Sequence, residues 1–235
     1  MDSSKGQLGR IHPNRPVASP IHFLLVLLLE GAIAYRGILH TPQSRSVANI
    51  DHVGSYARTI LQEWFVLAFV LVGVWWGGSS LLTVLGERWL SPCQFFRDLG
   101  IGAAFLIVSF FVVAVVGPLL GMNHDNRDIQ FLLPHGRMET ALWVLIAVSA
   151  GICEEAVFRG YLQLQFSALT KSAPLGILLS AVSFGLVHSY QGFSRAAVIT
   201  IGGALSGVLA YWRKSVRPGM FAHTLQDLLA LLVRQ

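Results

Sequence analysis

The chain has 235 residues and a formal net charge of +5, and 54% of its residues are apolar while only 12% are charged. With a mean hydropathy of +0.60 and about half the charged fraction of an ordinary soluble domain, this composition excludes a soluble globular protein. The seventeen Lys and Arg residues lie scattered between apolar runs. That pattern is typical of loops flanking membrane spans and argues against a nucleic-acid partner.

Residues 1–20 are polar and contain three prolines and three basic residues. We expect this stretch to be a polar N-terminal tail. No small-residue cleavage site follows the first apolar run, so the pattern does not indicate a secretory signal peptide.

Seven apolar segments follow the tail. Runs of this length can cross a hydrocarbon core about 30 Å thick, and in lipid they must be helical. The first segment is the weakest candidate because it is short and contains Glu30. The segments are 21–35, 60–85, 99–122, 140–166, 174–188, 195–212 and 219–233.

The sequence therefore predicts an all-α, polytopic membrane helix bundle with about six to seven transmembrane helices. We divide it into N-terminal membrane helices at 21–122 and a catalytic bundle at 135–235. Glycines are frequent in the fifth and sixth segments, where small residues let helices approach closely. A slight excess of Lys and Arg on the N-terminal side favours a cytoplasmic N-terminus in the cell membrane, and the orientation inverts if the first segment does not cross.

The first polar cluster lies inside the fourth apolar segment and reads Glu154-Glu155-Ala-Val-Phe-Arg159-Gly. Charges in a membrane segment cost several kcal/mol each, so their presence indicates a function. Residues four apart share a helix face, and Glu155 and Arg159 can therefore pair. Glu154 lies about 100° away around the axis and is left available as a general base. The alternative is an acidic helix end at the membrane surface.

Two further clusters follow in the C-terminal segments. Phe184 and His188 share one helix face, and His223 and Asp227 share another. A carboxylate facing His188 from a neighbouring helix would let the pair hold and deprotonate a water. Taken alone, each histidine is also compatible with a structural role, either in the core or at a helix end capped by polar side chains.

The order of these three clusters resembles the CPBP family, which includes the type II CAAX prenyl endopeptidases and bacteriocin-processing or immunity proteins. The family motifs are Glu-Glu-x-x-x-Arg, Phe-x-x-x-His and His-x-x-x-Asn, and the resemblance covers roughly the last hundred residues. It implies a glutamate-type intramembrane endopeptidase. Matching the family motifs residue by residue, the resemblance implies that Glu154 and His188 activate the water and that His223 and Asp227 stabilise the oxyanion. It implies that Glu155 and Arg159 organise the site.

One position departs from the family pattern, because Asp227 stands where Asn is usual. An ionised Asp cannot donate a hydrogen bond to an oxyanion. Asp227 must therefore be protonated or must instead orient His223.

Several alternatives remain open from the sequence. Two Glu and two His could hold zinc, although no His-Glu-x-x-His motif is present and the resemblance implies a metal-free site without cofactor. The same fold could serve an immunity or scaffold role without proteolysis. A proton-coupled transporter is a third class, but no internal repeat supports it. We expect membrane lipid and a membrane-associated peptide or protein as partners, with the peptide sequence and any role for a prenylated CAAX terminus undetermined.

Overall fold

The structure is a computed structural model, and it describes residues 15–39, 51–122 and 132–233. Most of the predicted polar tail lies outside these residues. The described part contains helices and no strands, which confirms the predicted all-α helix bundle. In chain order the helices are α1 (Pro20–Leu39), α2 (His52–Trp76), α3 (Leu82–Leu85), α4 (Pro92–Leu119), α6 (Arg137–Glu154), η4 (Glu155–Leu162), α7 (Gln163–Thr170), α8 (Ala173–Val187), η5 (Ser189–Gln191), α9 (Phe193–Arg213), α10 (Arg217–Leu229) and η6 (Ala230–Val233).

Within the described residues, five helical stretches are long and apolar enough to cross a membrane. They are α1, α2, α4, the continuous α6–η4–α7 stretch of 34 residues, and α9. Helix α8 is also apolar but has only 15 residues. The chain is thus an integral membrane protein with several spans, as its composition predicts.

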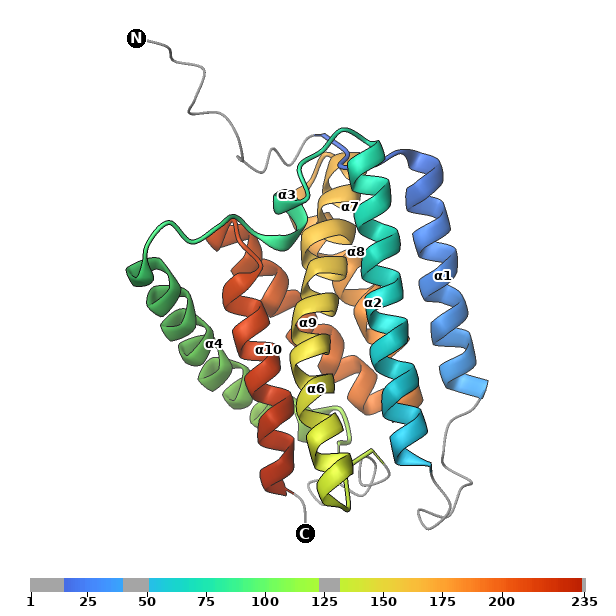
Figure 1. Cartoon of the computed structure of the whole chain (residues 1–235), viewed down its shortest axis with the longest axis vertical. Coiled ribbons are helices and arrows are strands. Elements are labelled where there is room, and N and C mark those ends of the chain that lie inside the picture. Colours follow the sequence, from blue (N-terminus) through green and yellow to red (C-terminus); the bar gives the residue numbers. More distant parts are fainter. Residues whose placement is uncertain (1–14, 40–50, 123–131, 234–235) are drawn as a thin grey trace.

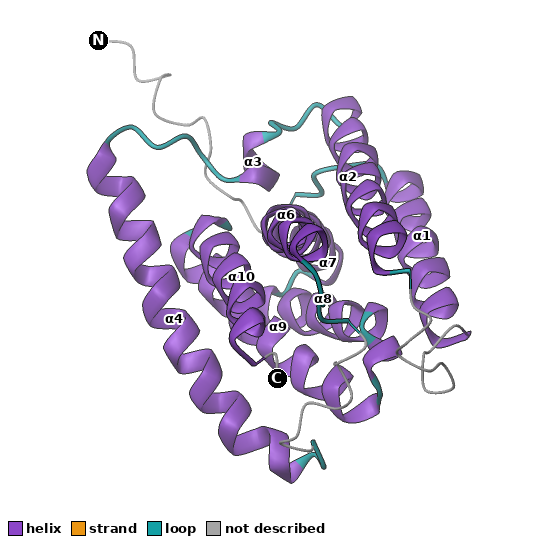
Figure 2. Cartoon of the chain, turned by 60° about the horizontal axis from the view of Figure 1, so that its bottom comes forward, coloured by secondary structure: helices purple, strands orange, loops and turns teal. Residues whose placement is uncertain are grey.

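The 34-residue span occupies the centre of the bundle (Figure 1). Seen from its end, it has α1 and α2 on one side and α10 and α4 on the other (Figure 2). Its central part, η4, is a π-helix in which every residue is buried. One hydrophobic core joins residues of α1 and α2 to residues of η4 and α8. The division of the chain into an N-terminal and a catalytic part stays a prediction, since helices from both parts share this core.

Two boundaries of the second predicted segment, 60–85, were wrong. Helix α2 begins eight residues earlier, at His52, where the Asp51 side chain accepts a hydrogen bond from the Gly54 backbone N–H and caps the helix. It ends at Trp76, because Gly77 and Gly78 form a turn in which Gly78 has a φ of +73°. The glycine turn therefore ends the helix before the apolar run does, and the apolar run alone predicted too late an end.

Small residues let the C-terminal helices approach closely, as the sequence predicts. A Cβ on Gly185 of α8 would lie 2.8 Å from the Ala196 carbonyl oxygen of α9. A Cβ on Gly207 of α9 would lie 2.7 Å from Oε1 of Gln163. These close approaches bring α8 and α9 against each other and against the central span.

Candidate active site

Glu154 is the last residue of α6 and lies near the middle of the 34-residue span. Its carboxylate oxygen Oε2 is 3.9 Å from Nε2 of His188 and 3.6 Å from Nε2 of His223. The same oxygen is buried and has no hydrogen-bond partner among the described residues. Buried polar atoms are nearly always hydrogen-bonded, to protein or to ordered water, so this oxygen requires a partner.

The tautomer of His188 follows from its own hydrogen bond. Nδ1 lies 2.8 Å from the carbonyl oxygen of Phe184. A carbonyl oxygen only accepts, so Nδ1 must carry the proton and donate. In the neutral imidazole Nε2 is then an acceptor, and it faces Oε2 of Glu154. Two acceptors face each other across a space that a water molecule can bridge by donating one hydrogen to each.

The Glu155–Arg159 pair forms as the spacing predicts. The guanidinium of Arg159 is 3.0 Å from the Glu155 carboxylate, and both side chains are almost fully buried. Arg159 also stacks over the ring of Phe184 at 4.1 Å. The π-helix η4, with i→i+5 hydrogen bonding, begins at Glu155 and was not predicted. This π-helix contains Glu155 and Arg159, and π-helical turns are frequent at functional sites.

Three carboxylates surround His223 on α10. Nδ1 is 3.5 Å from Glu155, and Nε2 is 3.6 Å from Glu154 and 3.7 Å from Asp227. Neighbouring negative charges favour the protonated imidazolium. The predicted i, i+4 contact between His223 and Asp227 is present, and it makes Asp227 a charge partner of His223.

The structure thus brings all six predicted site residues into one network that spans α6, η4, α8 and α10. Phe184 lies at its centre, with its ring 4.6 Å from the His188 ring and edge-on to the His223 ring. No group of three or more His, Cys, Asp or Glu side chains in the described ranges has a metal-binding arrangement.

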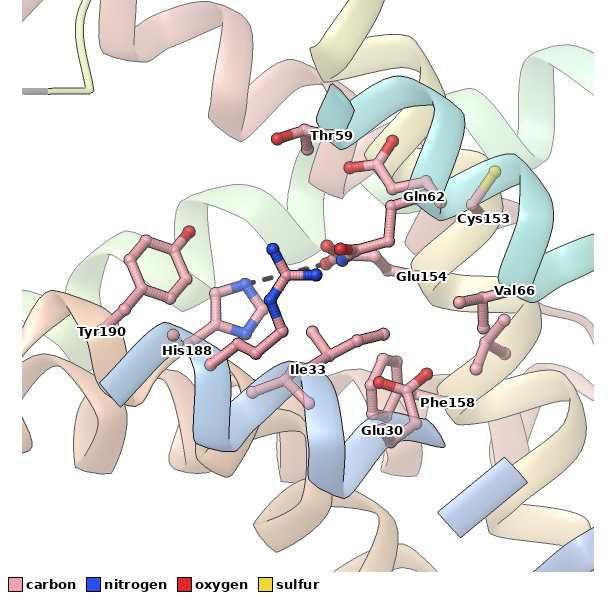
Figure 3. A pocket seen from close by; sticks show the side chains of 15 residues that line it. Glu30, Ile33, Thr59, Gln62, Val66, Cys153, Glu154, Phe158, His188 and Tyr190 are labelled. Atoms are coloured by element: carbon pink, nitrogen blue, oxygen red, sulfur yellow. Dashed lines mark ion pairs between the residues drawn. The ribbon is translucent and has the colours of Figure 1, made fainter. Parts of the chain in front are cut away.

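A pocket opens beside this network and is shown in Figure 3. Glu154 and His188 line it, together with side chains from α1, α2 and η5. The sequence analysis gave no role to several polar residues of this wall, among them Glu30, Glu63 and Tyr190. Glu63 accepts a hydrogen bond of 2.5 Å from the Ser149 hydroxyl. Burial raises the pKa of Tyr190 to about 12, so its hydroxyl stays protonated at neutral pH.

Gly219 on α10 packs directly against the Glu155 carboxylate. A Cβ there would lie 2.6 Å from Oε2 of Glu155. The Glu155 carboxylate is held by its ion pair with Arg159, so moving it would weaken that pair. We expect Gly219→Ala to lower the free energy of unfolding by about 1–3 kcal/mol through overpacking, and to lower activity by displacing Glu155.

Gly202→Ala on α9 is the matched control, because a Cβ there meets nothing within 4 Å. Its better helix propensity should leave the free energy of unfolding unchanged or raise it by up to about 1 kcal/mol. The two variants are compared by denaturant titration in mixed micelles. Equal unfolding midpoints would contradict the close packing of Glu155 on α10.

The fold and this network define a polytopic helical membrane protein with a buried Glu/His cluster. Residues 136–229 match the family described as Type II CAAX prenyl endopeptidase Rce1-like. The match confirms the resemblance to CPBP-type peptidases and includes all six site residues, while α1, α2 and α4 lie outside it. No curated protein and no solved structure matches the chain.

Proposed function

We propose that the protein is a glutamate-type intramembrane endopeptidase that hydrolyses a peptide bond in a membrane-associated substrate. The observation that carries this proposal is the buried Oε2 of Glu154, which has no hydrogen-bond partner among the described residues and faces Nε2 of His188 at 3.9 Å. A water molecule about 2.8 Å from both Oε2 of Glu154 and Nε2 of His188 could donate a hydrogen bond to each of them. The match of residues 136–229 to the family described as Type II CAAX prenyl endopeptidase Rce1-like supports the same reaction class.

In the proposed reaction the bridging water attacks the peptide carbonyl carbon as Glu154 takes its proton. The imidazolium of His223 lies 3.6 Å from Glu154 and donates to the developing oxyanion. Asp227 and Glu155 hold His223 in its charged form. The C–N bond then breaks, and the proton held by Glu154 passes to the leaving amine. This scheme gives Asp227 a role that needs no hydrogen-bond donor.

His188→Asn tests the role of the second acceptor. The Asn amide can still donate to the Phe184 carbonyl, as Nδ1 of His188 does, but it offers no basic nitrogen facing Glu154. We expect a fall in kcat on the order of 10²-fold or more. The assay uses purified protein in liposomes with prenylated and unprenylated peptide libraries, and mass spectrometry identifies the products.

His135→Asn is the matched control, because His135 is exposed and lies away from the site on the segment before α6. Wild-type protein that cleaves no peptide, with or without a prenyl group, would favour the immunity or scaffold alternative. Activity lost in EDTA and restored by zinc would favour a metalloprotease. Fractionation of cells tests the accompanying proposal that the protein resides in the plasma membrane.

A further inference from the structure

Glu30 is a carboxylate buried inside the membrane-spanning helix α1. Its side chain lines the pocket, and the residue is only 7% exposed. Within the described ranges it has neither a hydrogen-bond donor nor a cation as partner. An ionisable group at this depth is costly, so a partner is expected when the protein works.

The other carboxylates of the pocket have partners of their own. Glu63 accepts the hydrogen bond from Ser149, and Glu154 faces the two histidines. The cation in the lining is Arg36, which is exposed and lies six residues further along α1. At 1.5 Å per residue, Arg36 is about 9 Å from Glu30 along the helix axis. The pocket lining therefore supplies no cation that pairs with Glu30 among the described residues.

The walls beside Glu30 are apolar. Ile33, Val66 and Phe158 line the same pocket, and Figure 3 places Glu30 on the opposite side from Tyr190, with its carboxyl group pointing into the cavity. A pocket with apolar walls and an unpaired carboxylate fits a side chain that has a methylene stem and a cationic end. Lysine and arginine have this form, and their charge-assisted hydrogen bonds to a carboxylate are strong.

We propose that Glu30 is a specificity-determining residue that binds a lysine or arginine side chain of the substrate, close to the scissile bond. The pocket that holds Glu30 is continuous with Glu154 and His188, so a peptide bound there lies next to the reacting groups. This inference rests on the proposed peptidase function and adds the chemical class of the substrate.

The test uses the full chain in liposomes and a peptide library in which one position at a time is Lys, norleucine or Glu. At one position near the cleaved bond, wild-type protein should favour Lys over norleucine by at least tenfold in kcat/KM. Glu30→Gln should reduce this ratio to below about threefold. Glu30→Lys should favour the Glu peptide instead, and the exposed control Glu87→Gln should keep the wild-type ratio.

Three results would overturn the inference. One is a wild-type protein that cleaves Lys and norleucine peptides equally at every position, which leaves the peptidase function intact. Another is a Glu30→Gln variant that keeps the tenfold ratio, or that slows both peptides by the same factor. The third is the absence of any cleavage by wild type, which removes the peptidase function as well. Glu30→Leu should unfold at a midpoint no lower than wild type, and a lower midpoint would assign Glu30 a structural role.

Discussion

Replacing Glu154 with Gln is expected to lower kcat for peptide hydrolysis by a factor on the order of 10²–10⁴. Gln has nearly the same shape, but it cannot take a proton from the water between it and His188. Binding of the peptide should change little, because the amide oxygen can still accept a hydrogen bond. The measurement is kcat and KM of purified variants in liposomes, with product formation followed by mass spectrometry.

Glu87→Gln provides the matched control, since Glu87 is an exposed residue in the loop that follows α3. It makes the same chemical change away from the site and should keep wild-type kcat. A Glu154→Gln variant that retains more than about one tenth of wild-type kcat would assign proton transfer to another group.

The second large effect is expected on stability, from Arg159→Met. The change removes the nearer of the two cations that contact the buried Glu155 carboxylate and leaves His223 at 3.5 Å, which two other carboxylates share. Breaking a buried ion pair by removing one partner costs about 3–5 kcal/mol, because the remaining charge stays poorly compensated in a dry site. The stacking of Arg159 on Phe184 is lost as well. Denaturant unfolding in mixed micelles measures the change.

The double variant Glu155→Gln/Arg159→Met should recover part of the lost stability, since neither charge then remains buried. Arg97→Met is the control, because the Arg97 side chain is 54% exposed and its buried partner Asp98 keeps a second cation, Arg213, at 3.4 Å. Its effect should stay within about 1 kcal/mol. Equal losses for Arg97→Met and Arg159→Met would show that the buried pair does not stabilise the fold.

Much of this site could be predicted because its contacts within helices follow helical spacing. The Glu155–Arg159 and His223–Asp227 contacts are both separations of four residues, which a sequence displays directly. The approach of Glu154 to His188 and His223 crosses between helices. Spacing alone could not predict it, and the family resemblance supplied that expectation.

Other features had weaker signals in the sequence. The π-helix η4 depends on tertiary packing around eight buried residues rather than on residue type. Glu30 and Glu63 belong to no motif of the family. Their signal was a carboxylate within an apolar segment, which marked Glu30 only as a reason to doubt the first span. Because a charged group in a membrane segment costs several kcal/mol, the same observation also marks Glu30 as a candidate functional residue, and the structure places it in the lining of the pocket.

The most direct test of the water-activated mechanism is peptide hydrolysis by the purified wild-type protein in H₂¹⁸O with EDTA, with the products analysed by mass spectrometry. The mechanism predicts cleavage with one ¹⁸O in the newly formed carboxyl group, and no such product from Glu154→Gln. Labelled product formed equally by wild type and by Glu154→Gln, or no cleavage by wild type, would contradict the assignment of Glu154 and His188 as the groups that activate water.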